Sequence, residues 1–303
     1  MAKITGTFID EITCDIGSQN WSEEDWKRDF EAMAFIGIDT VIIIRGAYKD
    51  QAVFPSKVVG NHGDPDNAIV WLDEAAKHNM KLYFGTYCQD QNAVTNERST
   101  AGEISANLEF IDEVVSRYWG HPAFTGWYIC HEVCKHEEGI NNLFKQIAVH
   151  AKEQTPNAPA LISPYYPSEI LLGKDALPPA EFGESWRQIL NGLTGLVDVM
   201  AFQDGTAPRA LLPAYLAEAK RIGNEHGIEL WNNVETFDRG MSYFFPPRDI
   251  RVLRKALEVA EPYVRKTITF EFSHFMSPNS CFPGAANLYR RYCEVMLGMK
   301  SPF

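Results

Sequence analysis

Two glutamates directly follow hydrophobic, strand-like runs, and their positions suit acid–base chemistry. Glu132 follows the run at 124–130, and Glu235 ends the run at 228–235. Because side chains alternate along a strand, both carboxylates can point inward. Two carboxyl groups that flank a glycosidic bond can divide the work, one protonating the leaving oxygen and the other attacking the anomeric carbon. The pair favours a glycosidase; the alternative is that each glutamate only hydrogen-bonds loop amides or pairs with Arg45.

Other polar and aromatic residues also lie at or near the ends of strand-like runs. Acids, amides and aromatic rings together suit a polyhydroxylated ligand with apolar sugar faces. We therefore expect a carbohydrate substrate, contacted by Asp10, Arg45, Tyr87, His131, Tyr165, Gln203, Asp204, Trp231, Asn233 and His274. Each has a structural alternative: the aromatic rings can be packing, the histidines can be ordinary hydrogen-bonded side chains, and the arginine can serve an ion pair. Arg45 also has a functional reading, in which it lowers the pKa of a nucleophilic Glu235.

The elements that would position these residues form eight strand–helix pairs. Short β-rich runs alternate with helical patterns along the whole chain, which is typical of repeated βα units around a parallel sheet. The expected strands are 4–12, 40–48, 80–87, 124–130, 158–166, 196–204, 228–235 and 267–275. The expected helices lie near 21–37, 67–79, 103–119, 138–154, 180–192, 209–226, 247–260 and 285–298.

Eight such pairs predict an α/β fold of the (β/α)8 TIM barrel class, with residues 1–303 as a single domain. An open doubly wound sheet is the competing fold, but it often has a glycine-rich phosphate turn after its first strand, where this chain has Asp10 and Glu11. In a barrel the loops after the strands converge, so the fourth and seventh strands would place Glu132 and Glu235 nearly across the mouth. Glu271, in the middle of the expected eighth strand, is predicted to be a buried, paired carboxylate.

Composition excludes several classes of partner. The 303 residues carry a formal net charge of −12, which disfavours nucleic acid and anionic lipid surfaces. No apolar run is long enough to span a membrane, and the first residues lack the pattern of a secretory signal, so we expect a soluble, cytoplasmic protein. The cysteines are scattered without CxxC spacing and are predicted to be reduced thiols: Cys14, Cys88, Cys130, Cys134, Cys281 and Cys293.

Several segments also resemble a bacterial family of barrel proteins known as domain of unknown function 4434. They span nearly the whole chain: ITGTFIDEI, NWSEEDW, GIDTVIIIRGAY, GWYICHE, AFQDG, NNVETF and FEFSHFMSP. That family is similar to the clan-A glycoside hydrolases, retaining enzymes whose acid/base follows strand 4 and whose nucleophile follows strand 7. The resemblance implies Glu132 as acid/base and Glu235 as nucleophile, and it makes Arg45 similar to an arginine often found in that clan.

The sequence departs from the clan-A pattern at two places. His131 precedes Glu132 where an asparagine commonly bonds the sugar 2-hydroxyl. Phe272 and His274 stand where a tryptophan is frequent on strand 8. Both departures bear on which sugar the site would take.

Two other functions remain open at this stage. A metal-dependent sugar isomerase or epimerase could use a divalent cation held by Glu132, Asp204, Glu235 and His274. A non-catalytic carbohydrate-binding barrel would need only the polar ring. For the glycosidase we expect no cofactor and no metal, since the segment 131–136 matches no zinc-ligand spacing. The sugar, the linkage and the oligomeric state do not follow from the sequence.

Overall fold

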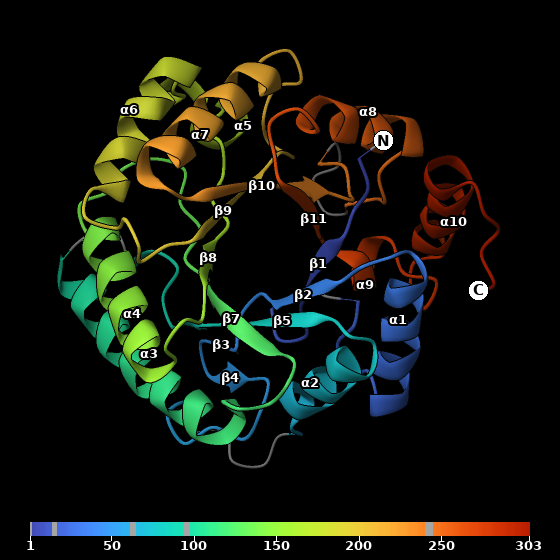
Figure 1. Cartoon of the computed structure of the whole chain (residues 1–303), viewed down its shortest axis with the longest axis horizontal. Helices are drawn as coiled ribbons and strands as arrows, with labels where there is room; N and C mark the ends of the chain where they lie inside the picture. The colour runs from blue at the N-terminus through green and yellow to red at the C-terminus, as the bar shows by residue number, and fades with distance from the viewer. Residues whose placement is uncertain (1, 14–16, 61–64, 94–96, 240–244) are drawn as a thin grey trace.

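The chain forms a closed barrel of eight parallel strands surrounded by helices (Figure 1), as the alternating pattern predicts. The computed structural model describes residues 2–13, 17–60, 65–93, 97–239 and 245–303. In barrel order the strands are β1 (Gly6–Ile9), β2 (Thr40–Ile43), β5 (Lys81–Gly85), β7 (Phe124–Ile129), β8 (Ala160–Ile162), β9 (Val199–Gln203), β10 (Glu229–Glu235) and β11 (Lys266–Phe270). The expectation of a TIM barrel is therefore confirmed, and β11 closes the ring by pairing with β1.

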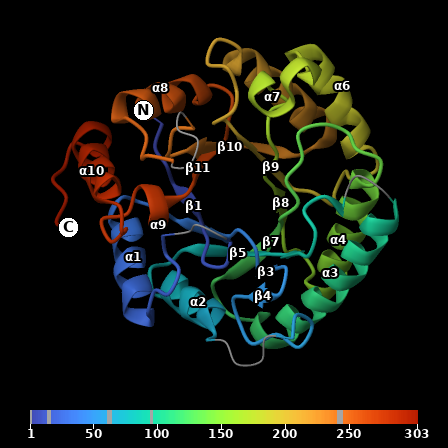
Figure 2. The same cartoon turned by 180° about the vertical axis from the view of Figure 1, so that it is seen from behind.

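A ring of helices encloses the barrel, as the two opposite views show (Figures 1 and 2). The helices that follow the barrel strands are α1 (Glu23–Phe35), α2 (Asn67–Lys77), α3 (Glu97–Tyr118), α4 (Ile140–Gln154), α6 (Pro179–Leu190), α7 (Leu212–His226), α8 (Ile250–Ala260) and α10 (Pro283–Tyr292). Shorter pieces are α5 (Glu169–Leu172), a 3₁₀ turn (Gly173–Asp175), α9 (Phe272–Phe275) and a π-helical turn (Cys293–Leu297). A small sheet beside the barrel has the order β4 (Gln51–Ala52), β3 (Ala47–Tyr48), β6 (Tyr87–Cys88).

The sequence signal at the start of α1 is a capping box. The Asp25 amide donates to Ser22 Oγ at 3.3 Å, and the Ser22 amide donates to Asp25 Oδ2 at 2.9 Å. These bonds satisfy two backbone donors that the first helical turn leaves free. The helix therefore begins directly after Ser22, as the spacing of the two residues predicts.

Each strand is buried on both faces, which is the reason the strands read as hydrophobic runs. Side chains that point into the barrel form one cluster: Phe8, Ile42, Ile44, Tyr83, Cys88, Tyr128, Cys130, Leu161, Val199, Ala201, Trp231 and Ile268. Side chains that point outward join a second, larger cluster with the helices, including Trp26, Trp71, Trp127 and Trp186. The alternation fixes which residues can reach the barrel axis at the strand ends.

The last strand is shorter than the sequence indicates. β11 ends at Phe270, and residues 272–275 form α9 instead of continuing the strand. Glu271 therefore lies just beyond the strand end and not in its middle. The side chain is fully buried as expected, but no ion pair with a cation is found for it in the described parts of the chain. Burial raises the pKa of Glu271 well above its usual value, and the nearby carboxylates of Asp10 and Asp29 add to this.

Glu271 should make the protein less stable as the pH rises. Because its pKa is raised, Glu271 stays protonated in the folded state at pH values above about 4.3, where the unfolded state loses this proton. The free energy of unfolding therefore falls as the pH increases. In Glu271→Gln this dependence is absent. We expect the difference in melting temperature, variant minus wild type, to increase by more than ~2 °C between pH 5 and pH 8. The same change at exposed Glu31 is the control, and a difference that does not vary with pH would refute the assignment.

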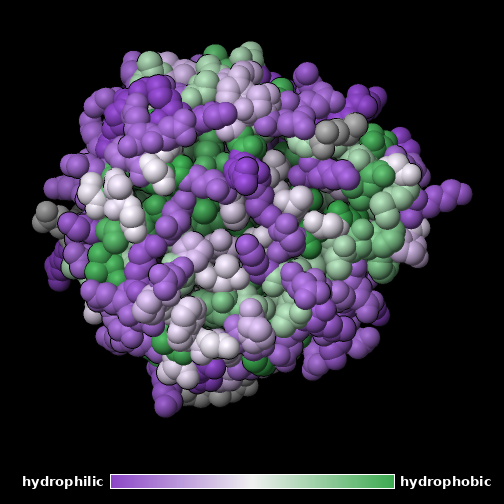
Figure 3. All heavy atoms as spheres, viewed as in Figure 1, coloured by the Kyte–Doolittle hydropathy of each residue, from purple (hydrophilic) through white to green (hydrophobic). Residues whose placement is uncertain are grey.

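One face of the molecule is mainly polar. Hydrophilic side chains predominate on the face seen in Figure 1, with hydrophobic ones in smaller groups between them (Figure 3). None of the described helices has the length and apolar character needed to cross a bilayer. Cys88, Cys130, Cys134, Cys281 and Cys293 are free thiols, as predicted, and Cys14 lies outside the described residues.

Candidate active site

A cavity of about 320 Å³ opens at the ends of the barrel strands. Six residues predicted as site residues line it: Asp10, Arg45, Glu132, Tyr165, Gln203 and His274. The remaining lining residues are Thr13, Ile44, Gln91, Phe237, Arg239, Phe245, Phe270 and Phe275. Polar groups and aromatic rings therefore share one enclosure, an arrangement that suits a ligand with both hydroxyls and apolar faces.

Glu132 is held in this cavity by two hydrogen bonds. The Gln203 side-chain amide donates to Oε1 at 2.8 Å, and the Tyr165 hydroxyl donates to Oε2 at 3.0 Å. Gln203 ends β9, and its amide also donates to the Ser163 carbonyl at 2.8 Å, which fixes its own orientation. Only 8 % of the Glu132 side chain is exposed, so its carboxyl group has a defined direction and limited contact with solvent.

Arg45 pairs with Glu132 and not with Glu235. Its Nη2 lies 3.6 Å from Glu132 Oε2, and its Nη1 donates to Thr13 Oγ1 at 3.2 Å. The guanidinium also lies over the Tyr48 ring, 5.2 Å from the ring centroid. Arg45 therefore supplies positive charge to the side of the cavity that holds Glu132.

Glu235 is paired with Arg239, four residues further along the chain. Arg239 Nε donates to Oε2 at 3.0 Å and Nη2 donates to Oε1 at 2.5 Å, so both carboxylate oxygens are engaged. The Glu235 side chain is 1 % exposed, whereas that of Arg239 is 28 % exposed and lines the cavity. Burial raises the pKa of Glu235, and the hydrogen bonds and charge of Arg239 oppose that rise. Glu235 itself is not among the residues that line the cavity, but the guanidinium that holds it is.

Gly205 leaves the space that Glu235 occupies. A Cβ atom added at this glycine would come within 1.6 Å of Glu235 Oε2. Next to it, Asp204 Oδ1 accepts the Glu235 backbone amide at 3.1 Å and lies 3.6 Å from Arg248 Nη1. The end of β9 therefore holds both the backbone and the carboxylate of Glu235 in place.

Tyr165 donates a hydrogen bond to Glu132 and also lies in the electrostatic field of Glu235. Burial raises the pKa of its hydroxyl well above the usual value, the carboxylates of Glu132 and Glu235 raise it further, and Arg239 opposes the rise. Both carboxylates therefore act electrostatically on the same phenol, with Arg239 among them.

Five predicted substrate-binding residues do not line the cavity. Tyr87 donates its hydroxyl to the Lys49 carbonyl at 2.6 Å, and Asp204 lines a neighbouring pocket that shares Arg239 with the cavity. Trp231 lies lower in the barrel interior, where its indole N–H donates to Glu229 at 2.6 Å, and Asn233 donates to Ser163 Oγ at 3.1 Å. The fifth residue, His131, faces away from the axis.

His131 belongs to a buried polar cluster outside the cavity. Its Nε2 lies 2.9 Å from Glu103 Oε1 of α3, and Glu103 also accepts the amides of Gln89 and Asp90. Cys88 lies beside them, and its pKa is lowered to about 7, first by the Cys130 side chain, with His131 and Arg45 contributing. A strand-end residue adjacent in sequence to Glu132 points outward by alternation, so His131 does not supply the contact to the 2-hydroxyl that clan-A enzymes make with asparagine.

The residues proposed for a divalent cation do not converge. Among the described residues, the group whose potential ligand atoms all lie within 4.8 Å of one another is Cys88, Glu103 and His131. Glu132, Asp204, Glu235 and His274 do not form such a group in the described parts of the chain. The isomerase alternative therefore lacks the ligand set on which it depended.

Comparison with known proteins identifies the family. The sequence profile of a family described as "Domain of unknown function (DUF4434)" matches residues 4–282. The chain belongs to the DUF4434 family. Comparison of this DUF4434 sequence with functionally curated proteins gives no match.

Solved structures similar to this DUF4434 protein include several whose descriptions name a glycosidase. A crystal structure from Bacteroides thetaiotaomicron VPI-5482, described as a "putative alpha-L-fucosidase", has 38 % identity and a TM-score of 0.91, over 97 % of this chain and 92 % of that one. An intracellular xylanase from Thermoanaerobacterium saccharolyticum has 12 % identity and a TM-score of 0.54 over 88 % and 86 %. An endo-1,4-beta-D-mannanase from Thermotoga petrophila has 11 % and 0.56 over 89 % and 88 %. The last two similarities establish the barrel fold alone.

Sequence reasoning missed the residues that loops bring to this DUF4434 cavity. Arg239, Phe237 and Phe245 follow β10 in a loop that has no periodic pattern, and Thr13 lies in the turn after β1. Ile44 and Phe270 carried a usable signal, because strand alternation directs both toward the axis near the strand ends. Arg239 is the most important of these residues. It makes the ion pair with Glu235 that the sequence suggests for Arg45.

Proposed function

We propose that this chain is a retaining glycoside hydrolase acting on a carbohydrate or glycoconjugate, with Glu132 as acid/base and Glu235 as nucleophile. The observation that carries the proposal is that one cavity is lined both by Glu132, after the fourth barrel strand, and by Arg239, which holds both carboxylate oxygens of Glu235 at the end of the seventh. A TIM-barrel fold shared with glycoside hydrolases supports the reaction class. Fold alone does not define an activity, so the site must carry the argument.

Glu132 suits the acid/base role because it lines the cavity directly. Hydrogen bonds from Gln203 and Tyr165 fix the plane of its carboxyl group, so a proton would be delivered in one direction. Arg45 Nη2 lies 3.6 Å from Oε2, so its positive charge faces the oxygen atoms from which the proton is given to the leaving group. In the second half of a retaining reaction the same carboxylate would activate water.

Glu235 suits the nucleophile role because Arg239 favours its ionised form. A carboxylate must be deprotonated to attack an anomeric carbon, and burial alone would work against this. The guanidinium engages both oxygens, so it must shift, or move together with the carboxylate, before Glu235 can form a bond to sugar. Arg239 thus has two effects on Glu235: it favours the ionised carboxylate, and it blocks access of the sugar to that carboxylate until it moves.

The cavity wall indicates which substrates to test first. Four phenylalanines line it together with the polar groups around Glu132: Phe237, Phe245, Phe270 and Phe275. Sugars with an apolar face bind well to such rings. The description of the Bacteroides thetaiotaomicron relative makes α-L-fucosides the first glycosides to test.

A non-catalytic carbohydrate-binding barrel is the second candidate, favoured by the closed ion pair between Arg239 and Glu235. In that case the pair would only stabilise the cavity wall. Sugar binding would then be unchanged in Glu132→Gln, and no substrate would be turned over.

A screen of aryl glycosides, beginning with 4-nitrophenyl α-L-fucoside, tests the proposal with wild type, Glu235→Gln and Glu132→Gln side by side. Release of nitrophenol by wild type that is lost in both variants supports it. NMR of the first-formed sugar then distinguishes retention from inversion of the anomeric configuration. Activity that survives Glu235→Gln, or an inverted product, contradicts the proposed mechanism.

Replacing Arg239 by Gln should shift the acidic limb of the pH–rate profile upward. Removing the cation leaves burial unopposed, so the pKa of Glu235 rises and the nucleophile becomes protonated at a higher pH. We expect the acidic limb of kcat/KM to move up by about one pH unit or more. Arg251→Gln, at an exposed arginine on α8, is the control and should leave the profile unchanged. An unmoved limb in Arg239→Gln would separate this arginine from the ionisation of Glu235.

A further inference from the structure

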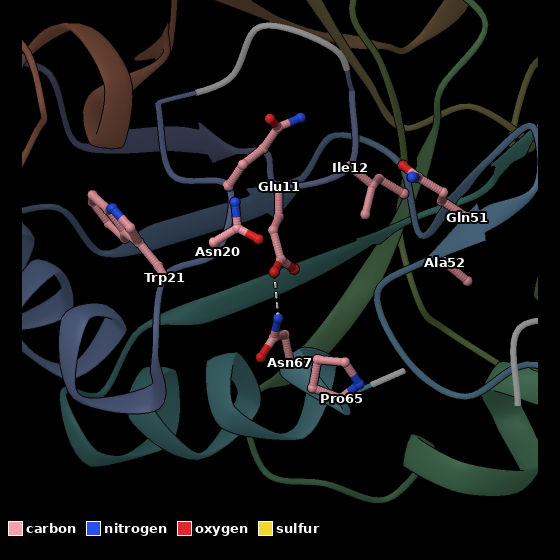
Figure 4. A pocket seen from close by; sticks show the side chains of 9 residues that line it. Glu11, Ile12, Asn20, Trp21, Gln51, Ala52, Pro65 and Asn67 are labelled. Atoms are coloured by element: carbon pink, nitrogen blue, oxygen red, sulfur yellow. Dashed lines mark hydrogen bonds between the residues drawn. The ribbon is translucent and has the colours of Figure 1, made fainter. Parts of the chain in front are cut away.

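A second, larger cavity lies beside the candidate active site and has no role in the proposed chemistry. It measures about 570 Å³ and is here called the side groove, lined by Glu11, Ile12, Gln19, Asn20, Trp21, Gln51, Ala52, Pro65 and Asn67. These residues come from the turn after β1, the segment before α1, β4 and the segment that leads into α2. In Figure 4 Glu11 points toward Asn67, while Trp21 and Gln51 lie on opposite sides.

One turn of the chain separates the side groove from the active-site cavity. Asp10 and Thr13 line the active-site cavity, whereas Glu11 and Ile12, between them, line the side groove. The turn is fixed, because Asp10 Oδ1 accepts the amides of Ile12 and Thr13 at 3.2 and 3.1 Å. Arg45, beside Glu132, holds the same turn through Thr13 Oγ1. A ligand that extends out of the active site over this turn would enter the side groove.

A hairpin provides a second shared wall. Tyr48 of β3 lies under the Arg45 guanidinium in the active site, and Gln51 and Ala52 of the paired strand β4 line the side groove. The two cavities are therefore adjacent along two independent segments. Their relative placement is set by backbone pairing and not by flexible side chains.

The polar groups of the side groove match the hydroxyls of a neutral sugar. Four of its residues are amides, each able to donate and to accept, and Glu11 adds a carboxylate acceptor. Asn67 is 7 % exposed, and its Nδ2 donates to Glu11 Oε1 at 2.6 Å, so the carboxylate is held in a defined orientation. Ile12, Trp21 and Pro65 supply apolar surface for the C–H faces of a pyranose ring.

The charge of the side groove selects against acidic sugars. Glu11 is the only charged residue among the nine described lining residues, and none of these is basic. A uronate, sulfate or phosphate group would meet the Glu11 carboxylate, and none of the described lining residues offers it a cation to compensate for its lost hydration. The chemistry therefore favours uncharged saccharides.

We propose that the side groove is a binding subsite for a neutral sugar unit of an oligosaccharide or glycan chain, beyond the sugar held at Glu132. This inference rests on the proposed function in one respect only, namely that the glycan is hydrolysed at Glu132. It predicts an enzyme whose preferred substrates are longer than a simple glycoside, because the adjoining units add binding energy that a small aryl group cannot supply.

The test uses an array of neutral and uronate-containing di- to hexasaccharides, with binding measured by calorimetry on the Glu235→Gln protein so that nothing is hydrolysed. Two substitutions, Glu11→Gln and Gln51→Ala, are then added together to the Glu235→Gln protein. Both are expected to leave the fold intact, because Gln51 is exposed and a glutamine at position 11 can still accept the hydrogen bond from Asn67. We expect neutral oligosaccharides to bind at least ~10-fold more weakly after these changes. Gln146→Ala, at an exposed glutamine on α4, is the matched control and should have no effect.

Hydrolysis gives a separate readout. In the otherwise wild-type enzyme, the two changes should lower kcat/KM for a long neutral oligosaccharide and leave kcat/KM for an aryl monosaccharide within about twofold. Equal losses on both substrates, unchanged binding, or no binding of any neutral oligosaccharide would overturn the subsite. Neutral-glycan binding that is weakened by the changes, in a protein that hydrolyses nothing, would support the subsite and refute the hydrolase.

Discussion

Glu235→Gln should abolish turnover of the best aryl glycoside, with kcat/KM reduced by at least about 10⁴-fold, the order of loss seen when a nucleophile is removed from a covalent mechanism. An amide cannot form the glycosyl–enzyme bond, although it can still accept one hydrogen bond from Arg239. Melting temperature should change little, because the space beside Gly205 remains filled. Initial rates and thermal unfolding of the two proteins provide the measurement.

A second substitution identifies the role of this carboxylate independently. In Glu235→Ala, added azide can enter the vacated space and attack the anomeric carbon from the same side. The product should be a glycosyl azide of inverted configuration, since only one displacement has occurred. Glu229→Gln, at the exposed start of the same strand, is the control and should retain wild-type activity. Rescue by azide without formation of a glycosyl azide would assign Glu235 a different role.

Glu132→Ala should cost about 10²–10⁴-fold in kcat/KM on substrates with poor leaving groups, which is the usual contribution of general acid catalysis. The loss should be much smaller for a dinitrophenyl glycoside, whose leaving group needs no proton. With that substrate the intermediate forms but is hydrolysed slowly, so a burst of dinitrophenol should precede a slow steady state. Stopped-flow absorbance measures both phases.

The pattern across leaving groups distinguishes acid catalysis from a structural role. If Glu132 only organised Tyr165 and Gln203, its removal would reduce the rates on all leaving groups by a similar factor. Glu138→Gln, at an exposed glutamate in the same βα loop, is the matched control and should have no effect. A uniform loss in Glu132→Ala would therefore contradict the acid/base assignment.

Local pattern was sufficient for the fold. The strands that end at Ile129 and Glu235 were expected within one residue of their observed ends, because hydrophobic runs of strand length recur with helical patterns between them. Strand 8 was overextended to residue 275, since Phe272 and Phe275 are buried whether the backbone is extended or helical. Burial alone does not reveal which backbone conformation achieves it.

The positions of Glu132 and Glu235 at the ends of the fourth and seventh strands follow from the sequence by itself, as does the inward direction given by strand alternation. Only the tertiary structure decided that Arg239, and not Arg45, pairs with Glu235, that His131 turns outward to Glu103, and that the turn at 10–13 separates two cavities. The physical reason is that strands and helices each have a characteristic spacing of hydrophobic residues, which can be read from one sequence. Contacts between loops depend on where distant segments end once the barrel has closed.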